Sequence, residues 1–160
     1  MEFEQRLQRA IQRGEQTRSS RDEARQAERL SSAELRDLYS QARLQLSEHI
    51  ESCLRKLADH FPGYRYDSIL GDTGWGSRIT RDDLQLARGQ SPSNQYSRLE
   101  LTITPLGSQP IIELVAKGTI RNREVLSRRH YQQLEQVDTQ SFSELIDLWV
   151  LEYAEQYAAT

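Results

Sequence analysis

The chain has 160 residues, of which 36% are hydrophobic and 28% charged, and its net charge at pH 7 is -3. This composition is typical of one globular domain that is large enough to bury a core. The apolar runs are short and the first ten residues lack an apolar stretch, so we expect neither a transmembrane helix nor a secretory signal.

Cys53 is the only cysteine of the chain. A single cysteine excludes an internal disulfide framework and a cysteine-rich zinc module. It fits a reducing compartment, and we take the cytoplasm as the expected location. No stretch of the sequence matches a catalytic or cofactor fingerprint, so the sequence predicts no cofactor and no metal.

Charge is unevenly distributed near the C-terminus. Residues 117–130 contain five basic side chains and one acidic side chain, whereas residues 131–160 contain six acidic side chains and no lysine or arginine. A basic segment followed by an acidic one can pair within one fold or between two copies. We favour pairing within one chain.

The N-terminal third of the sequence predicts helices. Residues 2–13 fit a short helix that ends at Gly14, and residues 12–29 fit either a solvated helix or a loose arm. Ser31 and Glu34 form a capping box before a long helix that ends ahead of Pro62. One apolar stripe runs along that helix: Leu35, Leu38, Ala42, Leu46, His49 with Ile50, Cys53 and Leu57. We therefore predict a polar helical arm over 1–30 and a single domain over 31–160.

The middle of the chain predicts antiparallel strands. Residues 64–70 fit a strand, and the glycine-rich residues 71–77 fit a flexible loop around a tryptophan. Residues 82–88 fit a short helix capped by Thr80 and a strand almost equally well. The strongest alternation lies in residues 98–104, where Leu99, Leu101 and Ile103 share one face.

Residues 111–121 and 124–131 fit two further strands joined by a tight loop at Asn122 and Arg123. This register places Lys117 directly opposite Arg128, a mildly destabilising pair of like charges. It also predicts one core face composed of Ile112, Leu114, Ala116, Gly118, Ile120, Val125 and Tyr131.

Ser141 is predicted to cap a helix over 142–158 that is apolar on most of its circumference. Such a helix is usually covered on two sides. The sheet supplies one cover, and the second is either the helix over 32–60 or another subunit. Trp149, Tyr153 and Tyr157 are the candidate interface residues for the second possibility.

His49 and Cys53 stand four residues apart on one helix face, a spacing at which two side chains can share a metal. We interpret them as ordinary core residues, because they lie within the apolar stripe. His60 is too far along the same helix to join them.

A small-ligand site is predicted around the 71–77 loop, because glycines beside an aromatic side chain suit a pocket lid. Its candidate residues are Asp72, Trp75 and Arg78, with Lys117, Arg128 and His130 on the neighbouring sheet face. The basic strand over 121–131 also suggests RNA or another nucleic acid. The pI of about 5.7 and the acidic helix that follows disfavour that reading.

The sequence therefore predicts an α+β domain with an antiparallel meander of three to five strands and a C-terminal helix on one sheet face. Our first functional hypothesis is a non-catalytic interaction or adaptor protein that forms a homodimer. The alternative is a binding module for a small anionic or aromatic ligand. Catalysis ranks third, and it would gain support if Cys53, His49 or His60 opened to solvent and converged with a carboxylate.

Overall fold

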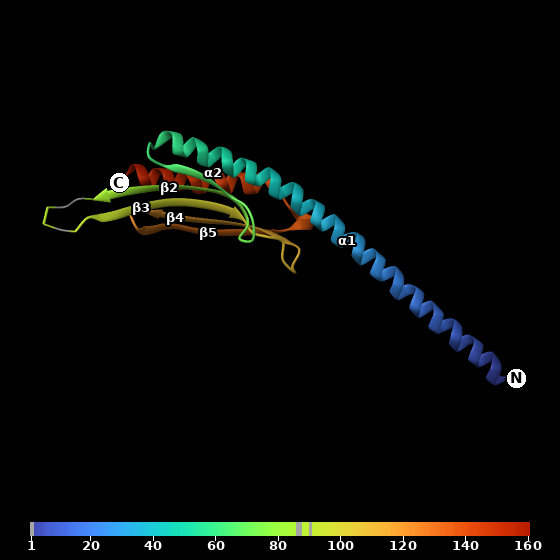
Figure 1. The fold of residues 1–160 in the computed structure, drawn as a ribbon. Helices are drawn as coiled ribbons and strands as arrows, with labels where there is room; N and C mark the ends of the chain where they lie inside the picture. Colours follow the sequence, from blue (N-terminus) through green and yellow to red (C-terminus); the bar gives the residue numbers. More distant parts are fainter. Residues whose placement is uncertain (1, 86–87, 90) are drawn as a thin grey trace. The chain divides into compact units, whose positions relative to one another are not determined.

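The computed structural model describes residues 2–85, 88–89 and 91–160, and the side chains of residues 27–31 and 85 lie outside this description. Five strands form one antiparallel meander in the order β1-β2-β3-β4-β5 (Figure 1). The elements in chain order are α1 (Glu2–His60), β1 (Arg65–Ile69), β2 (Trp75–Gln85), β3 (Ser93–Ile103), β4 (Ile111–Ile120), β5 (Arg123–Gln133), the 3-10 turn η1 (Leu134–Gln136) and α2 (Thr139–Ala158). The predicted α+β class is confirmed. No helix within the described residues combines the length and the apolarity needed to cross a bilayer.

The chain divides into two compact units, Met1–Asp37 and Leu38–Thr160. The first unit is helical from Glu2 onward, and its described side chains are exposed, apart from the half-buried Leu35. The second unit contains the sheet, α2 and residues 38–60 of α1, and it holds the hydrophobic core.

The predicted break between two N-terminal helices is wrong, because α1 is continuous from Glu2 to His60. Gly14 lies within the helix rather than at its end. A glycine costs a helix only about 1 kcal/mol relative to alanine, which is too little to stop it among so many strong helix formers. Residue 31 lies inside the same continuous helix, so no helix begins there, and the predicted cap falls on the side chain of Ser31, which lies outside the described residues. The predicted end before Pro62 is confirmed.

The segment after β1 is more regular than the sequence indicates. Only a tight turn separates β1 from β2, with Gly71 and Gly74 at φ +128° and +130° and the Gly74 N–H donating to the Gly71 carbonyl over 3.1 Å. Trp75 already begins β2, so the predicted loop over 71–77 is too long. The helical alternative capped by Thr80 is wrong, because β2 continues to Gln85. Of the remaining predicted residues, 86 and 87 lie outside the described part and 88 lies in a turn.

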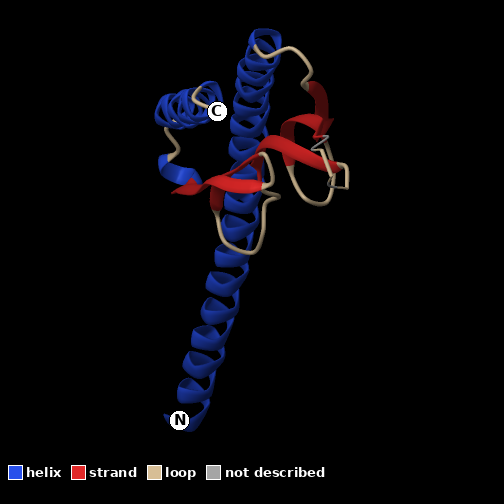
Figure 2. Cartoon of the chain, turned by 90° about the vertical axis from the view of Figure 1, so that its left-hand side faces the viewer, coloured by secondary structure: helices blue, strands red, loops and turns tan. Residues whose placement is uncertain are grey.

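Both helical segments of the second unit cover the same face of the sheet (Figures 1 and 2). Residues 38–60 of α1 lie over the β2 and β3 side, where the Tyr39 hydroxyl donates to the Thr104 carbonyl over 2.6 Å. The α2 helix lies over β4 and β5, where Tyr153 packs on Gly118. The predicted face of β3 is confirmed, since its three apolar side chains are fully buried: Leu99, Leu101 and Ile103.

The predicted register of the β4–β5 hairpin is wrong by two residues beside the turn and by one residue beyond a bulge. The turn residues are Arg121 and Asn122, both at positive φ, and a bulge follows at Gly118 and Thr119. Lys117 therefore pairs with Ser127, and Arg128 faces the helices from beside Ala116. The one-residue shift beyond the bulge also exchanges the two faces of β5, because side chains alternate with period two. Leu126 is buried in place of Val125, which is half-buried, and Tyr131 is 61% exposed.

Asp138, rather than Ser141, caps α2: its carboxylate accepts hydrogen bonds from the N–H groups of Gln140 and Ser141. Ser141 lies in the first turn instead. An aspartate at this position also interacts favourably with the positive end of the helix dipole. The second cover that α2 needs is residues 38–60 of α1, within the same chain.

Candidate functional site

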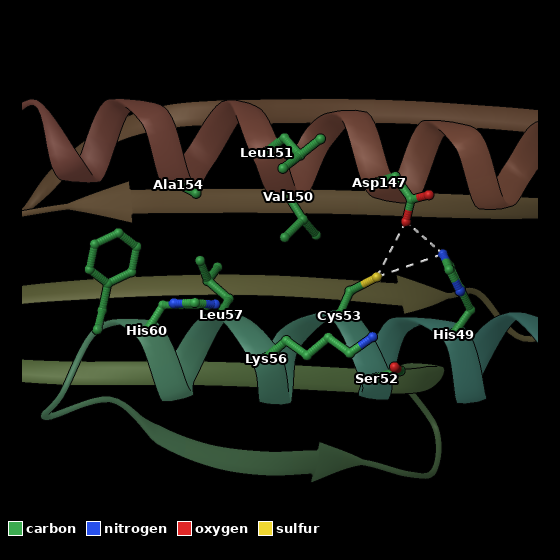
Figure 3. Close-up of a pocket in the computed structure, with 11 residues that line it drawn as sticks. His49, Ser52, Cys53, Lys56, Leu57, His60, Asp147, Val150, Leu151 and Ala154 are labelled. Atoms are coloured by element: carbon green, nitrogen blue, oxygen red, sulfur yellow. Dashed lines mark hydrogen bonds and ion pairs between the residues drawn. The ribbon is translucent and has the colours of Figure 1, made fainter.

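The main cavity of the second unit is a cleft between α1 and α2, with a volume of about 720 Å³. The two helices run side by side in the same direction here (Figure 3). The cleft is lined by His49, Ser52, Cys53, Lys56, Leu57, His60, Phe61, Asp147, Val150, Leu151 and Ala154. Its volume lies within the range of about 300–1,000 Å³ that small-molecule sites occupy.

One stretch of the cleft is apolar. Leu57 and Val150 are buried at its floor, and Leu151 is 65% exposed at its wall. Phe61 closes the far end, and its ring meets Tyr157 edge to face with 4.8 Å between centroids. These side chains offer an apolar and aromatic surface to a bound molecule.

The opposite end is polar and brings three reactive side chains together (Figure 3). His49 Nε2 lies 2.7 Å from Asp147 Oδ1, and Cys53 Sγ lies 3.4 Å from the same oxygen. The third side of this triangle, from Cys53 Sγ to His49 Nε2, measures 3.6 Å. The side chains of His49 and Asp147 are 33% and 53% exposed, so solvent reaches the cluster.

The geometry of the cluster does not suit a nucleophilic triad. In such a triad the histidine contacts the nucleophile through one ring nitrogen and the carboxylate through the other. Here Cys53 and Asp147 approach the same nitrogen, Nε2 of His49. Burial, followed by the hydrogen bond to Asp147 and its negative charge, raises the pKa of the Cys53 thiol to about 11. Without a bound cation the thiol is therefore protonated at neutral pH, and it donates to the carboxylate.

Two basic side chains, Lys56 and His60, line the same cleft beside its apolar floor. Lys56 and His60 are four residues apart on α1, so they occupy one helix face beside the apolar floor. Lys56 is exposed, and no ion pair within the described residues involves it. The cleft therefore combines an apolar body with a basic rim.

The structure places the three residues predicted around Trp75 in different surroundings. Trp75 packs against the core, with the Tyr39 ring at 6.3 Å and the Arg43 guanidinium 4.4 Å from its centroid. Asp72 is exposed in the turn before β2. Arg78 lies on the opposite face of β2 from Trp75, because three residues separate them along a strand.

The remaining predicted ligand residues lie on two different sheet faces. Lys117 lines a hollow of about 220 Å³ on the face without helices. Arg128 faces α2 and donates to Glu152 over 2.8 Å, and the His130 ring packs on Phe142 with 5.1 Å between centroids. The basic segment and the acidic helix are thus paired within the chain at this position.

The three predicted interface residues are largely covered by their own chain. Trp149 and Tyr153 are 6% and 0% exposed, and Tyr157 is half-buried between Phe61 and Tyr64. The apolar side chains that α2 leaves open are Leu148 and Leu151 instead, at 58% and 65% exposure.

The sequence interpretation of His49 and Cys53 as core residues is wrong, because both are only half-buried and line the cleft. Their four-residue spacing places both side chains on one face of α1. The missing element was Asp147, which stands 94 residues beyond Cys53 in the chain. Only the packing of α2 beside α1 brings its carboxylate to the pair.

The chain matches no protein-family model, and searches of the curated proteins and of the solved structures find no match. The geometry of the cleft is therefore the basis for inferring a function.

Proposed function

We propose that this protein is a binding module that holds a small amphipathic ligand, with an apolar or aromatic body and an anionic head group, in the cleft between α1 and α2. The observation that carries the proposal is the cleft itself, which has a volume of about 720 Å³ and combines an apolar floor with a basic rim. Burying apolar ligand surface against Leu57, Val150 and Phe61 supplies the driving force. The ammonium of Lys56 supplies selectivity for an anion, with His60 beside it.

The anionic aromatic dye anilinonaphthalene sulfonate tests this proposal directly. We expect saturable fluorescence enhancement with one site per chain. Ala154→Phe places a ring in the cleft and should weaken binding at least about tenfold, a loss of about 1.4 kcal/mol. Ala158→Phe makes the same change at the end of α2, outside the lining residues, and should leave the affinity unchanged.

The charge of the ligand is tested with Lys56→Gln. This variant should weaken binding of the sulfonate dye several-fold, yet leave binding of its uncharged analogue phenylnaphthylamine unaltered. Equal affinity of Ala154→Phe and Ala158→Phe for the dye would contradict the proposal. Dye binding without a defined stoichiometry would also contradict it, provided that cooperative unfolding shows the protein to be folded.

Self-association is the second candidate function, and it corresponds to an interaction or adaptor protein that forms a homodimer. Leu148 and Leu151 favour it, because these exposed side chains lie three residues apart on α2 and form an apolar patch, with Leu151 at the rim of the cleft. Charge complementarity favours a second copy of this chain as the partner of the patch. The α2 helix carries the exposed acids Glu144 and Glu155, and the β4–β5 hairpin exposes Arg121 and Arg123 at its tip. Nothing in this hypothesis requires Trp149 or Tyr153 to be accessible.

Sedimentation equilibrium tests self-association over a range of protein concentrations. We expect a mass that rises above 18.6 kDa with concentration and that returns to the monomer value in Leu148→Lys. Leu70→Lys, at another exposed leucine in the turn after β1, serves as the control. A monomer at every concentration would remove this candidate.

The cytoplasm remains the proposed location, which the free thiol of Cys53 supports.

A further inference from the structure

We propose that His49, Cys53 and Asp147 bind one divalent transition-metal ion, and that Zn²⁺ is the ion that these ligands suit best. The proposal rests on the convergence of three donor atoms and does not depend on a ligand in the apolar part of the cleft. All three atoms lie within 4.8 Å of one another.

The distances between the donors are close to those of a tetrahedral zinc site. Zinc bonds of about 2.0–2.2 Å to nitrogen and oxygen and about 2.3 Å to sulfur place the corners of a tetrahedron roughly 3.3–3.6 Å apart. The sulfur–oxygen and sulfur–nitrogen distances in the cluster are 3.4 and 3.6 Å. The nitrogen–oxygen distance of 2.7 Å is that of a direct hydrogen bond. It must open by roughly 0.7 Å to admit zinc, which a rotation of the exposed Asp147 carboxylate can provide.

The backbone holds these donors in place before any ion binds. His49 and Cys53 are one helical turn apart on α1, so their side chains emerge from the same face. Asp147 emerges from α2, and the buried side chains Ile50, Leu54 and Ile146 fix the adjoining turns of both helices. Metal binding therefore requires only side-chain adjustment.

The donor set selects among metals. A thiolate and an imidazole favour zinc and similar transition metals, whereas magnesium and calcium prefer oxygen ligands alone. Binding replaces the thiol proton of Cys53, which leaves to solvent, and it uses the lone pair of His49 Nε2 once the ring proton resides on Nδ1. Three protein ligands leave a fourth zinc position, the pattern of sites that accept water or an exchangeable ligand. A bound ion would add positive charge at the polar end of the cleft.

Metal binding to the full chain, freed of metal with a chelator, provides the test, with no dye present. Zinc is titrated against a chromophoric chelator, and cobalt is added as a spectroscopic probe. We expect one ion per chain and a thiolate-to-cobalt charge-transfer band in the near ultraviolet. We also expect zinc to raise the melting temperature, because the ion binds the native state preferentially.

Cys53→Ala should abolish the charge-transfer band, and His49→Gln should weaken zinc binding by at least about 100-fold, since loss of an outer-sphere partner alone costs about 10–100-fold. His60→Gln is the matched control, because His60 lines the same cleft away from the three donors. Asp147→Asn removes one ligand at an exposed position and so tests the site even if Cys53→Ala folds poorly. Equal zinc affinity in the wild type and His49→Gln, or no charge-transfer band in the wild type, would overturn the proposal and would leave the dye-binding result unaffected.

Discussion

Replacing Gly76 with alanine is expected to lower the free energy of unfolding by at least about 3 kcal/mol, a large part of the roughly 5–15 kcal/mol that stabilises a domain. A Cβ at this position would lie 1.9 Å from the Leu101 carbonyl oxygen and 2.9 Å from the Thr102 Cα. Both are backbone atoms of β3, so no side-chain rotation can relieve the overlap. The two strands would have to separate, and urea unfolding measures the loss.

Gly107→Ala is the control for this prediction. Gly107 lies in the loop between β3 and β4, a Cβ there meets no atom within 4 Å, and its φ is not positive. We expect its free energy of unfolding to stay within about 0.5 kcal/mol of the wild type. Equal stability of Gly76→Ala and Gly107→Ala would contradict the close contact between Gly76 and the backbone of β3.

Patterns that repeat over several residues could be predicted from the sequence. The alternation around Leu99, Leu101 and Ile103 predicted a buried strand face, and the apolar stripe before Pro62 predicted both a long helix and its end. Such patterns repeat one requirement over several residues, so they outweigh single substitutions. Gly14 and Ser31 were local signals by comparison, and the surrounding helix-forming residues overrode them.

The hairpin shows why a small local error can mislead about a site. A turn at Arg121 and Asn122 and a turn one residue later differ little in sequence preference, because asparagine tolerates positive φ in either. The earlier turn alone shifts each cross-strand partner by two residues and leaves the side chains on their predicted faces, whereas the bulge at Gly118 and Thr119 takes back one residue. The bulge therefore places Arg128 on the other face of the sheet from Lys117, and the predicted cationic face does not form.

The candidate site required information that the sequence does not display. The spacing of His49 and Cys53 identified two of its donors, but their place in an apolar stripe favoured burial. Asp147 lies on the face of α2 that turns toward α1, and this orientation depends on how both helices pack on the sheet. The convergence of the three side chains is thus a property of tertiary packing rather than of any local motif.

The second large effect that we expect is a loss of folding stability at alkaline pH, caused by ionisation of buried tyrosines. Tyr153 is fully buried, donates to the Thr119 carbonyl over 3.0 Å and lies 2.9 Å from the Tyr64 hydroxyl. Burial raises the pKa of Tyr153 well above its usual value of 10, although the hydrogen bond from Tyr64 opposes this shift. Burial and the contact with Tyr153 also raise the pKa of Tyr64.

A folded-state pKa above the unfolded value means that the neutral hydroxyl stabilises the fold below pH 10 and that this contribution is lost as the pH rises further. Each such group lowers the free energy of unfolding by up to about 1.4 kcal/mol per pH unit in that range. We therefore expect the stability of the wild type to fall steeply above pH 10. The partly exposed Tyr64 should contribute less than Tyr153.

Tyr153→Phe separates this effect from general alkaline unfolding. At pH 7 the variant should be less stable by about 1–3 kcal/mol, because the Thr119 carbonyl loses its donor in a buried position. Above pH 10 the difference from the wild type should shrink, since phenylalanine has no proton to lose. Tyr131→Phe, at a tyrosine that is 61% exposed, should follow the wild type at every pH. Urea unfolding between pH 7 and pH 11 measures both differences, and a constant gap between Tyr153→Phe and the wild type would contradict the burial of this hydroxyl pair.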